Sequence, residues 1–252
     1  DTEFVLSQGL LDVLFEYPIQ SDRSNFSIQP TFARLGLRTI TVLRFLPPGD
    51  GVVRAFEVEG NPGLIRLDPR WHQAALKENR QKAYDDFIAV AEDLVAKKIT
   101  QPKKLGIMGG SNGGLLMGVM MTQRPDLFGA VVCQVPLLDM RRFNQLLAGA
   151  SWMGEYGNPD VAAEWDYISK YSPYQNIKAK TQYPNILFTT STRDDRVHPG
   201  HARKMMAKMQ NEGVKSVWYY ENMEGGHAGA ADNSQKADMT ALEYSFLWKM
   251  LK

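Results

Sequence analysis

The chain has 252 residues, of which 44% are hydrophobic and 23% charged, and its formal net charge is +1. This length suits one large α/β domain with a substantial core. The near-neutral charge gives no electrostatic reason to expect nucleic acid or an anionic membrane as a partner.

Single residues and short motifs exclude several kinds of site and segment. Cys133 is the single cysteine of the sequence, so an internal disulfide is excluded, and its apolar surroundings favour a small core residue. The sequence holds no H-E-x-x-H motif and no Cys-x-x-Cys pair, so we expect neither a metal nor another cofactor. No apolar run reaches the roughly 18 residues of a membrane span, and no signal peptide opens the chain. A cytoplasmic location is therefore favoured.

The predicted elements divide the chain unevenly. Residues 1–70 hold apolar runs with irregular alternation, and we expect them to supply outer strands. From about Trp71 onward, strand and helix patterns alternate as in a doubly wound sheet. Short apolar runs predict four strands: 105–108, 128–135, 185–190 and 216–220. Helical spacing predicts four helices: 72–98, 115–122, 200–211 and 234–251. The whole, 1–252, is predicted to be a single α/β domain with a mostly parallel sheet flanked by helices.

A glycine-rich turn stands between the first of these strands and its helix. Residues 109–114 read Gly-Gly-Ser-Asn-Gly-Gly, which is the G-x-S-x-G pattern of a nucleophile elbow. Such a turn forces Ser111 into a strained backbone conformation and needs glycine two residues to either side. It also aims the first amides of the next helix at whatever the serine oxygen attacks. The alternative is that Ser111 merely caps the helix, although a cap needs no flanking glycines.

A base and an acid follow in the order that a serine nucleophile requires. The strand at 185–190 leads to Asp194 and Asp195, and the strand at 216–220 leads to Glu-Gly-Gly-His, ending at His227. Ser, then Asp, then His, each just past a strand, is the chain order of α/β hydrolases. The residues alone leave the choice between Asp194 and Asp195 open. His227 is favoured over its competitors because it lies in a glycine-rich loop after a late strand; the competitors are His72, His198 and His201.

Five longer segments carry a family resemblance. They are WHQAALKENRQKAYDDF (71–87), GGSNGGLLMG (109–118), TQRPDLFGAVVCQVPLLDM (122–140), DDRVHPGH (194–201) and EGGHAGA (224–230). Residues 71–252 thereby resemble the catalytic domain of prolyl oligopeptidase-type serine peptidases. The resemblance implies an α/β-hydrolase fold without metal or other cofactor.

The same resemblance implies roles for single residues. Ser111, Asp194 and His227 would be the nucleophile, the orienting acid and the general base. The resemblance selects Asp194 over Asp195, because the family's acid is the first aspartate of the Asp-Asp-Arg motif. The backbone N–H of Asn112 would be an oxyanion donor. Two further residues would bind substrate: Arg196, which matches a family arginine that grips a carbonyl, and Trp152, which lies near the place of a tryptophan that stacks on proline. A core tryptophan is an equally good interpretation of Trp152.

Residues 1–70 depart from the family pattern. The chain has no room for the family's β-propeller. The family's Tyr-Gly-Tyr-Gly-Gly-Phe segment, whose tyrosine is the second oxyanion donor, should lie near Leu10–Phe15 and is absent, although Tyr17 could substitute. An Arg-Gly-Gly-Gly-Glu loop expected before Trp71 is also absent. Codons for residues 55–61 can spell that loop in a shifted frame, and we hypothesise that part of this region reflects such a shift, which the coding DNA would decide.

Three functions are therefore expected from the sequence, in order of preference. The first is a serine peptidase that cleaves short peptides after proline through an acyl-enzyme. The second is a carboxylesterase, because an open site with a weakened oxyanion hole handles small esters more easily than amides. The third is a catalytically impaired hydrolase-fold domain. The sequence indicates a small peptide or ester as the substrate and does not indicate the oligomeric state.

Overall fold

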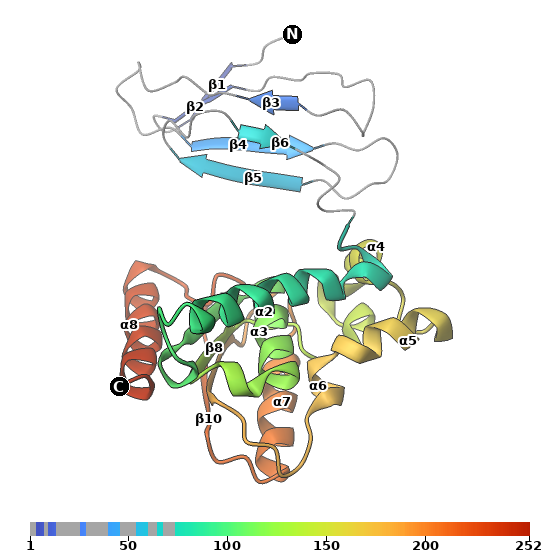
Figure 1. Ribbon diagram of the computed structural model, residues 1–252. Coiled ribbons are helices and arrows are strands. Elements are labelled where there is room, and N and C mark those ends of the chain that lie inside the picture. The colour runs from blue at the N-terminus through green and yellow to red at the C-terminus, as the bar shows by residue number, and fades with distance from the viewer. Residues whose placement is uncertain are drawn as a thin grey trace. The chain divides into compact units, whose positions relative to one another are not determined.

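The computed structural model describes residues 74–252 throughout and, before them, the backbone of six short strands (Figure 1). The chain divides into two compact units, residues 1–73 and 74–252. In the first unit the strands form three antiparallel pairs: β1 (Phe4–Ser7) with β2 (Leu10–Val13), β3 (Phe26–Ile28) with β6 (Ile65–Leu67), and β4 (Ile40–Phe45) with β5 (Arg54–Glu59). The expectations of one domain and of outer strands from residues 1–70 stay predictions.

A four-stranded parallel sheet forms the centre of the second unit. Its strands lie in the order β10, β9, β8, β7, with bounds β7 Gly106–Gly110, β8 Ala130–Gln134, β9 Asn185–Ser191 and β10 Val217–Asn222. All four predicted strands are present. The side chains of β8 and β9 are almost wholly buried, as the continuous apolar runs indicate for strands covered on both faces.

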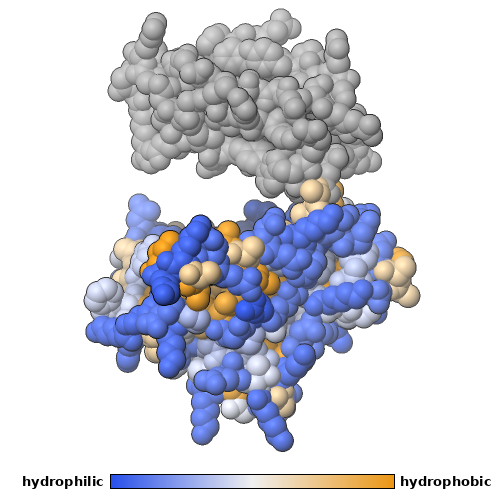
Figure 2. All heavy atoms as spheres, viewed as in Figure 1, coloured by the Kyte–Doolittle hydropathy of each residue, from blue (hydrophilic) through white to orange (hydrophobic). Residues whose placement is uncertain are grey.

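Alternate residues of β8 point to different helical layers. Val131 and Cys133 belong to the large core that also contains side chains of α3 (Asn112–Gln123), α2 (Gln81–Ala96) and α7 (Gly200–Asn211). Ala130 and Val132 instead pack with Phe246 of α8 (Asn233–Met250). The unit is therefore a doubly wound sheet with helices on both faces, as predicted, and the side seen in Figure 2 is mostly hydrophilic.

Short helices complete this unit. The long segment between β8 and β9, called the excursion below, contains five helical pieces: η5 (Phe143–Gln145), η6 (Leu147–Trp152), α4 (Met153–Tyr156), α5 (Ala162–Tyr171) and α6 (Pro173–Asn176). Three further 3₁₀ turns lie outside it: η2 (Lys77–Asn79), η3 (Pro102–Lys104) and η4 (Pro125–Leu127). α4 and α5 both lie against η2. The excursion thus packs beside the start of α2.

The predicted helix over 72–98 is shorter in the structure. α2 begins only at Gln81, because Leu76 is extended and Lys77 has a φ of 47°, which breaks the helical path. Arg80 stands between η2 and α2 and turns into the protein, where it is 8% exposed. The periodic apolar residues of this segment do not reveal the break, since a 3₁₀ turn continues nearly the same pattern. His72 lies outside the described residues.

Candidate active site

The turn between β7 and α3 has the geometry of an elbow. Ser111 has φ 58° and ψ −115°, a strained conformation that costs about 1–3 kcal/mol. Its N–H donates to the carbonyl of Gln134 on β8 at 3.0 Å, which ties the turn to the neighbouring strand. Its side chain forms no capping hydrogen bond with α3. The helix-cap interpretation of Ser111 is therefore not supported.

The glycines of the turn act differently from the prediction. A Cβ at Gly109 would lie 2.7 Å from the carbonyl oxygen of Gly113, so glycine is required there, as expected. A Cβ at Gly113 would meet nothing within 4 Å. Gly114 is the second tight position instead, since its Cβ would lie 2.8 Å from the Gln134 carbonyl oxygen and from Pro136. Close packing of α3 on β8 sets this requirement, and the pentapeptide pattern alone does not reveal it.

Ser111, His227 and Asp194 form a hydrogen-bonded chain. His227 Nε2 lies 3.0 Å from Ser111 Oγ. The other ring nitrogen, Nδ1, lies 3.0 and 2.9 Å from the two carboxylate oxygens of Asp194. Asp194 is 4% exposed, whereas its neighbour Asp195 is exposed and makes none of these contacts. The structure thus brings together the three residues that the sequence singles out.

The loop after β9 holds Asp194 in its ionised form. Asp194 Oδ1 accepts hydrogen bonds from the backbone N–H groups of Arg196 and Val197, both at 2.9 Å. Burial alone raises the pKa of Asp194, but the hydrogen bonds from His227 and these two amides outweigh it and hold the pKa below its ordinary value. An ionised carboxylate at this place favours the His227 tautomer that carries its proton on Nδ1.

The loop after β10 that carries His227 is braced by side chains. Asn222 is 6% exposed, and its Oδ1 accepts from the N–H groups of Glu224 and Gly225 at 2.9 and 2.8 Å. The amide nitrogen of Asn222 donates to Gln235 of α8 at 2.8 Å. These bonds join the end of β10 to the start of α8, with the His227 loop between them. The position of the imidazole is therefore fixed from two elements.

The remaining predicted residues lie at the start of α3, in the loop after β9 and at the end of η6. Asn112 is the first residue of α3, so its N–H has no carbonyl of its own helix to bond. Arg196 is exposed, and its carbonyl accepts from the N–H of Ala148 at 3.4 Å, which links its loop to η6. Trp152 ends η6 and is half-buried against the large core. Tyr17 and residues 14–15 of the expected second oxyanion segment lie outside the described residues.

Two residues beside the elbow escape the sequence analysis. Arg80 Nη2 and the Tyr156 hydroxyl both donate to Asn112 Oδ1, each at 2.7 Å. Arg80 lies where the sequence predicts a continuous helix. No sequence pattern there distinguishes a buried arginine from an exposed one. Tyr156 lies in the aromatic excursion, where many residues share its composition. The sole signal is the length of the excursion between two strands, because a long insertion in an α/β fold usually covers the site.

The competing histidines have other partners. His201 is 1% exposed, and its Nδ1 accepts from the backbone N–H of Asp139 at 3.0 Å. His198 Nδ1 accepts from the N–H of Gly200 at 2.9 Å. Both rings therefore stabilise the turn into α7 and its contact with the loop after β8. Neither contacts Ser111.

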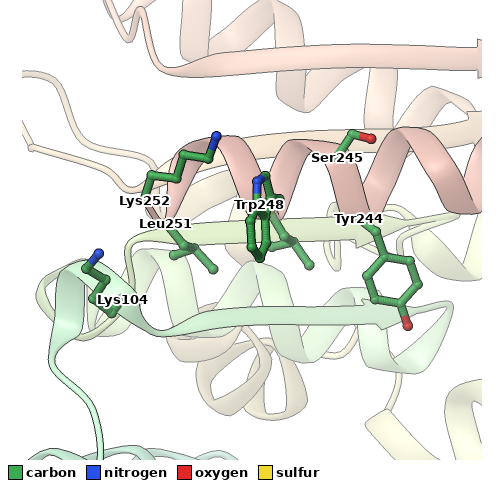
Figure 3. Close-up of a pocket in the computed structure, with 7 residues that line it drawn as sticks. Lys104, Tyr244, Ser245, Trp248, Leu251 and Lys252 are labelled. Atoms are coloured by element: carbon green, nitrogen blue, oxygen red, sulfur yellow. The ribbon is translucent and has the colours of Figure 1, made fainter.

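The described residues give no indication of a metal site. Within residues 74–252 and the six strands, no group of three or more His, Cys, Asp or Glu side chains is placed to hold a metal ion. Nor does this part of the chain contain a helix long and apolar enough to cross a membrane. A surface hollow lies between α8 and the residues before β7, lined by Lys104, Tyr244, Ser245, Leu247, Trp248, Leu251 and Lys252 (Figure 3). It runs along α8 from Lys104, which lies before the amino end of β7, to Tyr244, and it includes none of the predicted site residues.

Several known peptidases are similar in sequence to this chain. A peptidase of Sinorhizobium fredii, described as uncharacterized, is 58% identical over 197 residues, which are 78% of this chain and 27% of that protein. The prolyl endopeptidase of Dictyostelium discoideum is 39% identical over 186 residues, 72% of this chain and 24% of that protein. The chain thus spans about a quarter of the length of these relatives.

Solved structures show the same fold. Prolyl oligopeptidase B from Galerina marginata, bound to a 35mer substrate, matches with a TM-score of 0.66 and 32% identity over 72% of this chain and 26% of its own. A post-proline cleaving enzyme from Rickettsia typhi matches with a TM-score of 0.72 and 26% identity over 99% of this chain and 48% of its own. A model of the prolyl oligopeptidase family matches residues 52–252. The chain therefore belongs to the prolyl oligopeptidase family and has its α/β-hydrolase fold.

Proposed function

We propose that this chain is the catalytic part of a serine peptidase that cleaves peptides after proline through an acyl-enzyme intermediate. The observation that carries the proposal is the continuous hydrogen-bonded chain from Ser111 Oγ through His227 to Asp194. Its members follow the carboxyl ends of β7, β9 and β10 in one parallel sheet, and Ser111 lies on the strained elbow. The substrate class comes from the relatives, whose names describe prolyl endopeptidases and a post-proline cleaving enzyme.

The proposed reaction has two half-reactions, and in each of them His227 first takes a proton and then returns it. Ser111 Oγ attacks the carbonyl carbon of the proline residue, and His227 Nε2 takes the hydroxyl proton. The C–N bond then breaks, and His227 returns that proton to the leaving amine. Water repeats the sequence on the acyl-enzyme, which releases the acid and regenerates the Ser111 hydroxyl. Asp194 keeps Nδ1 protonated and stabilises the imidazolium.

The developing oxyanion would lie against the start of α3. The free N–H of Asn112 and the positive end of the helix dipole both favour negative charge there. Arg196 and Trp152 are proposed to contact the substrate, since the Arg196 loop follows Asp194 and is hydrogen-bonded to η6, which ends at Trp152. A cytoplasmic location, favoured by the sequence, also stays a prediction.

Turnover of two substrates tests the reaction class. We expect the protein to release the anilide from a proline-anilide, and Ser111→Ala to abolish that release. A short acyl nitrophenyl ester is the comparison substrate, because its leaving group needs no protonation. A clear preference for the ester would replace the peptidase proposal with the carboxylesterase. Hydrolysis of neither substrate by folded protein would favour the impaired hydrolase-fold domain.

A further inference from the structure

Arg80 is a buried charge whose guanidinium reaches the residue next to Ser111. Its Nη1 donates to Glu155 Oε1 at 2.5 Å, and its Nη2 donates to Asn112 Oδ1 at 2.7 Å. Its guanidinium carbon lies 5.0 Å from the centre of the Tyr156 ring and 5.8 Å from that of Tyr84. Burying a charge is costly unless it is paired and hydrogen-bonded, so this cluster is arranged around Arg80.

The charge of Arg80 is stable in this place. Burial lowers the pKa of its guanidinium, but the neighbouring Tyr84, Tyr156 and Glu155 outweigh burial and raise the pKa above its ordinary value. The side chain therefore keeps its full set of donors, which a planar guanidinium presents in a fixed geometry.

Asn112 is held by its side chain from two directions. Its Oδ1 accepts from Arg80 and also from the Tyr156 hydroxyl at 2.7 Å, which uses both lone pairs of the amide oxygen. Arg80 comes from the segment before α2, and Tyr156 ends α4 in the excursion. Both donors are buried, whereas Asn112 itself is exposed at the start of α3. An exposed asparagine with two buried donors is more constrained than its position requires for folding of the helix.

The peptide between Ser111 and Asn112 is the one that needs such constraint. A residue at φ 58° and ψ −115° persists only when its surroundings over-determine it. The N–H of this peptide is the proposed oxyanion donor, and a shift of one ångström at such a donor costs about a hundredfold in rate. We propose that Arg80 is a positioning residue, an inference that rests on the proposed function. Through the Asn112 side chain it aims the Asn112 N–H at the oxyanion. Tyr156 is the second donor to that side chain.

A double-mutant cycle tests this coupling. Arg80→Met removes the guanidinium but keeps an unbranched side chain, and Asn112→Ala removes the accepting amide but keeps the backbone N–H. We expect Arg80→Met to lower kcat on a proline-anilide by roughly tenfold to a hundredfold with little change in KM. In the Asn112→Ala background the same substitution should lower kcat less than about twofold, because the group through which Arg80 acts is gone.

Two further variants keep the test clear. Tyr156→Phe deletes one hydroxyl and leaves the core aromatic, so it can replace Arg80→Met in the cycle if that variant does not fold. Arg124→Met is the matched control, because Arg124 is also an ion-paired arginine, but its partners, Glu92 and Asp126, lie at the other end of α3. We expect it to leave kcat within about twofold of wild type.

The outcomes separate this inference from the proposed function. Labelling of wild-type Ser111 by a fluorophosphonate probe, with the non-additive losses above, supports both. Labelled wild type in which Arg80→Met costs the same factor with or without Asn112→Ala overturns the positioning role alone. A kcat unaffected by both Arg80→Met and Tyr156→Phe does the same. Wild type that neither labels nor turns over overturns both proposals.

Discussion

The two ends of the parallel sheet differ in how their side chains are held. At the carboxyl end, buried polar groups such as Asp194 and Asn222 bind backbone amides and fix the loops that follow each strand. At the amino end of β7, Leu247 and Leu251 pack near Gly106 beneath an open hollow, and Trp248 is 72% exposed. The surface of the hollow is mostly apolar, and none of its lining side chains forms a hydrogen bond with another residue that the structure describes. In this fold, convergent and constrained polar groups indicate the site better than concavity does.

Replacement of the orienting acid, at the carboxyl end of the sheet, is expected to have the largest effect on kcat. Asp194→Asn keeps the shape but removes the charge that fixes the His227 tautomer, so kcat should fall about 10⁴-fold. Asp195→Asn is the matched control, since that carboxylate is exposed and one residue away. We expect its kcat to stay within about twofold of wild type. Equal losses in the two variants, measured on a proline-anilide, would contradict the assignment.

We expect a smaller effect, on stability, from His201, a buried polar residue near the carboxyl end of the sheet. Burial, with smaller contributions from Lys204 and His198 and against the effect of Asp139, lowers the pKa of His201 to about 4 from 6.5. Between these values the unfolded chain binds a proton that the folded protein does not, so stability rises with pH through this window and is lost as pH falls. The free energy of unfolding should therefore drop by on the order of 3 kcal/mol from this group between pH 7 and pH 4.

Urea unfolding of two variants at both pH values measures that contribution. His201→Asn retains an acceptor near the position of Nδ1 but cannot titrate in this range, so its loss of stability on acidification should be smaller by that amount. His198→Asn removes a histidine from the same turn and should keep the wild-type loss. If His201→Asn and wild type lose the same free energy of unfolding on acidification, titration of His201 does not cause the loss of stability.

The smallest effect is expected at the hollow. Trp248→Ala removes a side chain that is largely exposed, so we expect a change in the free energy of unfolding below about 0.5 kcal/mol and kcat within about twofold of wild type. Phe246→Ala is the contrasting variant on the same helix, because Phe246 is 8% exposed and packs under the sheet. It should lose about 3 kcal/mol or more. A large loss of kcat in Trp248→Ala alone would give the hollow a catalytic role.

The sequence predicts the sheet of residues 74–252 well because each of its four strands contains a short apolar run. The order of Ser111, Asp194 and His227 along the chain is likewise readable, since each follows a strand. The choice of Asp194 over Asp195 needs either a family motif or three-dimensional contacts, because both residues lie in the same turn. Arg80 and Gly114 could not be predicted, because their constraints come from residues distant in sequence: Asn112 and Glu155 for the first, and the chain at Gln134 and Pro136 for the second.

Labelling with a fluorophosphonate probe tests directly whether Ser111 is an activated nucleophile, because this probe reacts with a serine only where a base and an oxyanion site activate it. We expect folded wild-type protein to be labelled on Ser111, Ser111→Ala to remain unlabelled, and urea-unfolded wild type to lose the reaction. Trp248→Ala should label at the wild-type rate. Two results would contradict the role of Ser111 as the nucleophile: no labelling of folded wild-type protein, or equal labelling of wild type and Ser111→Ala.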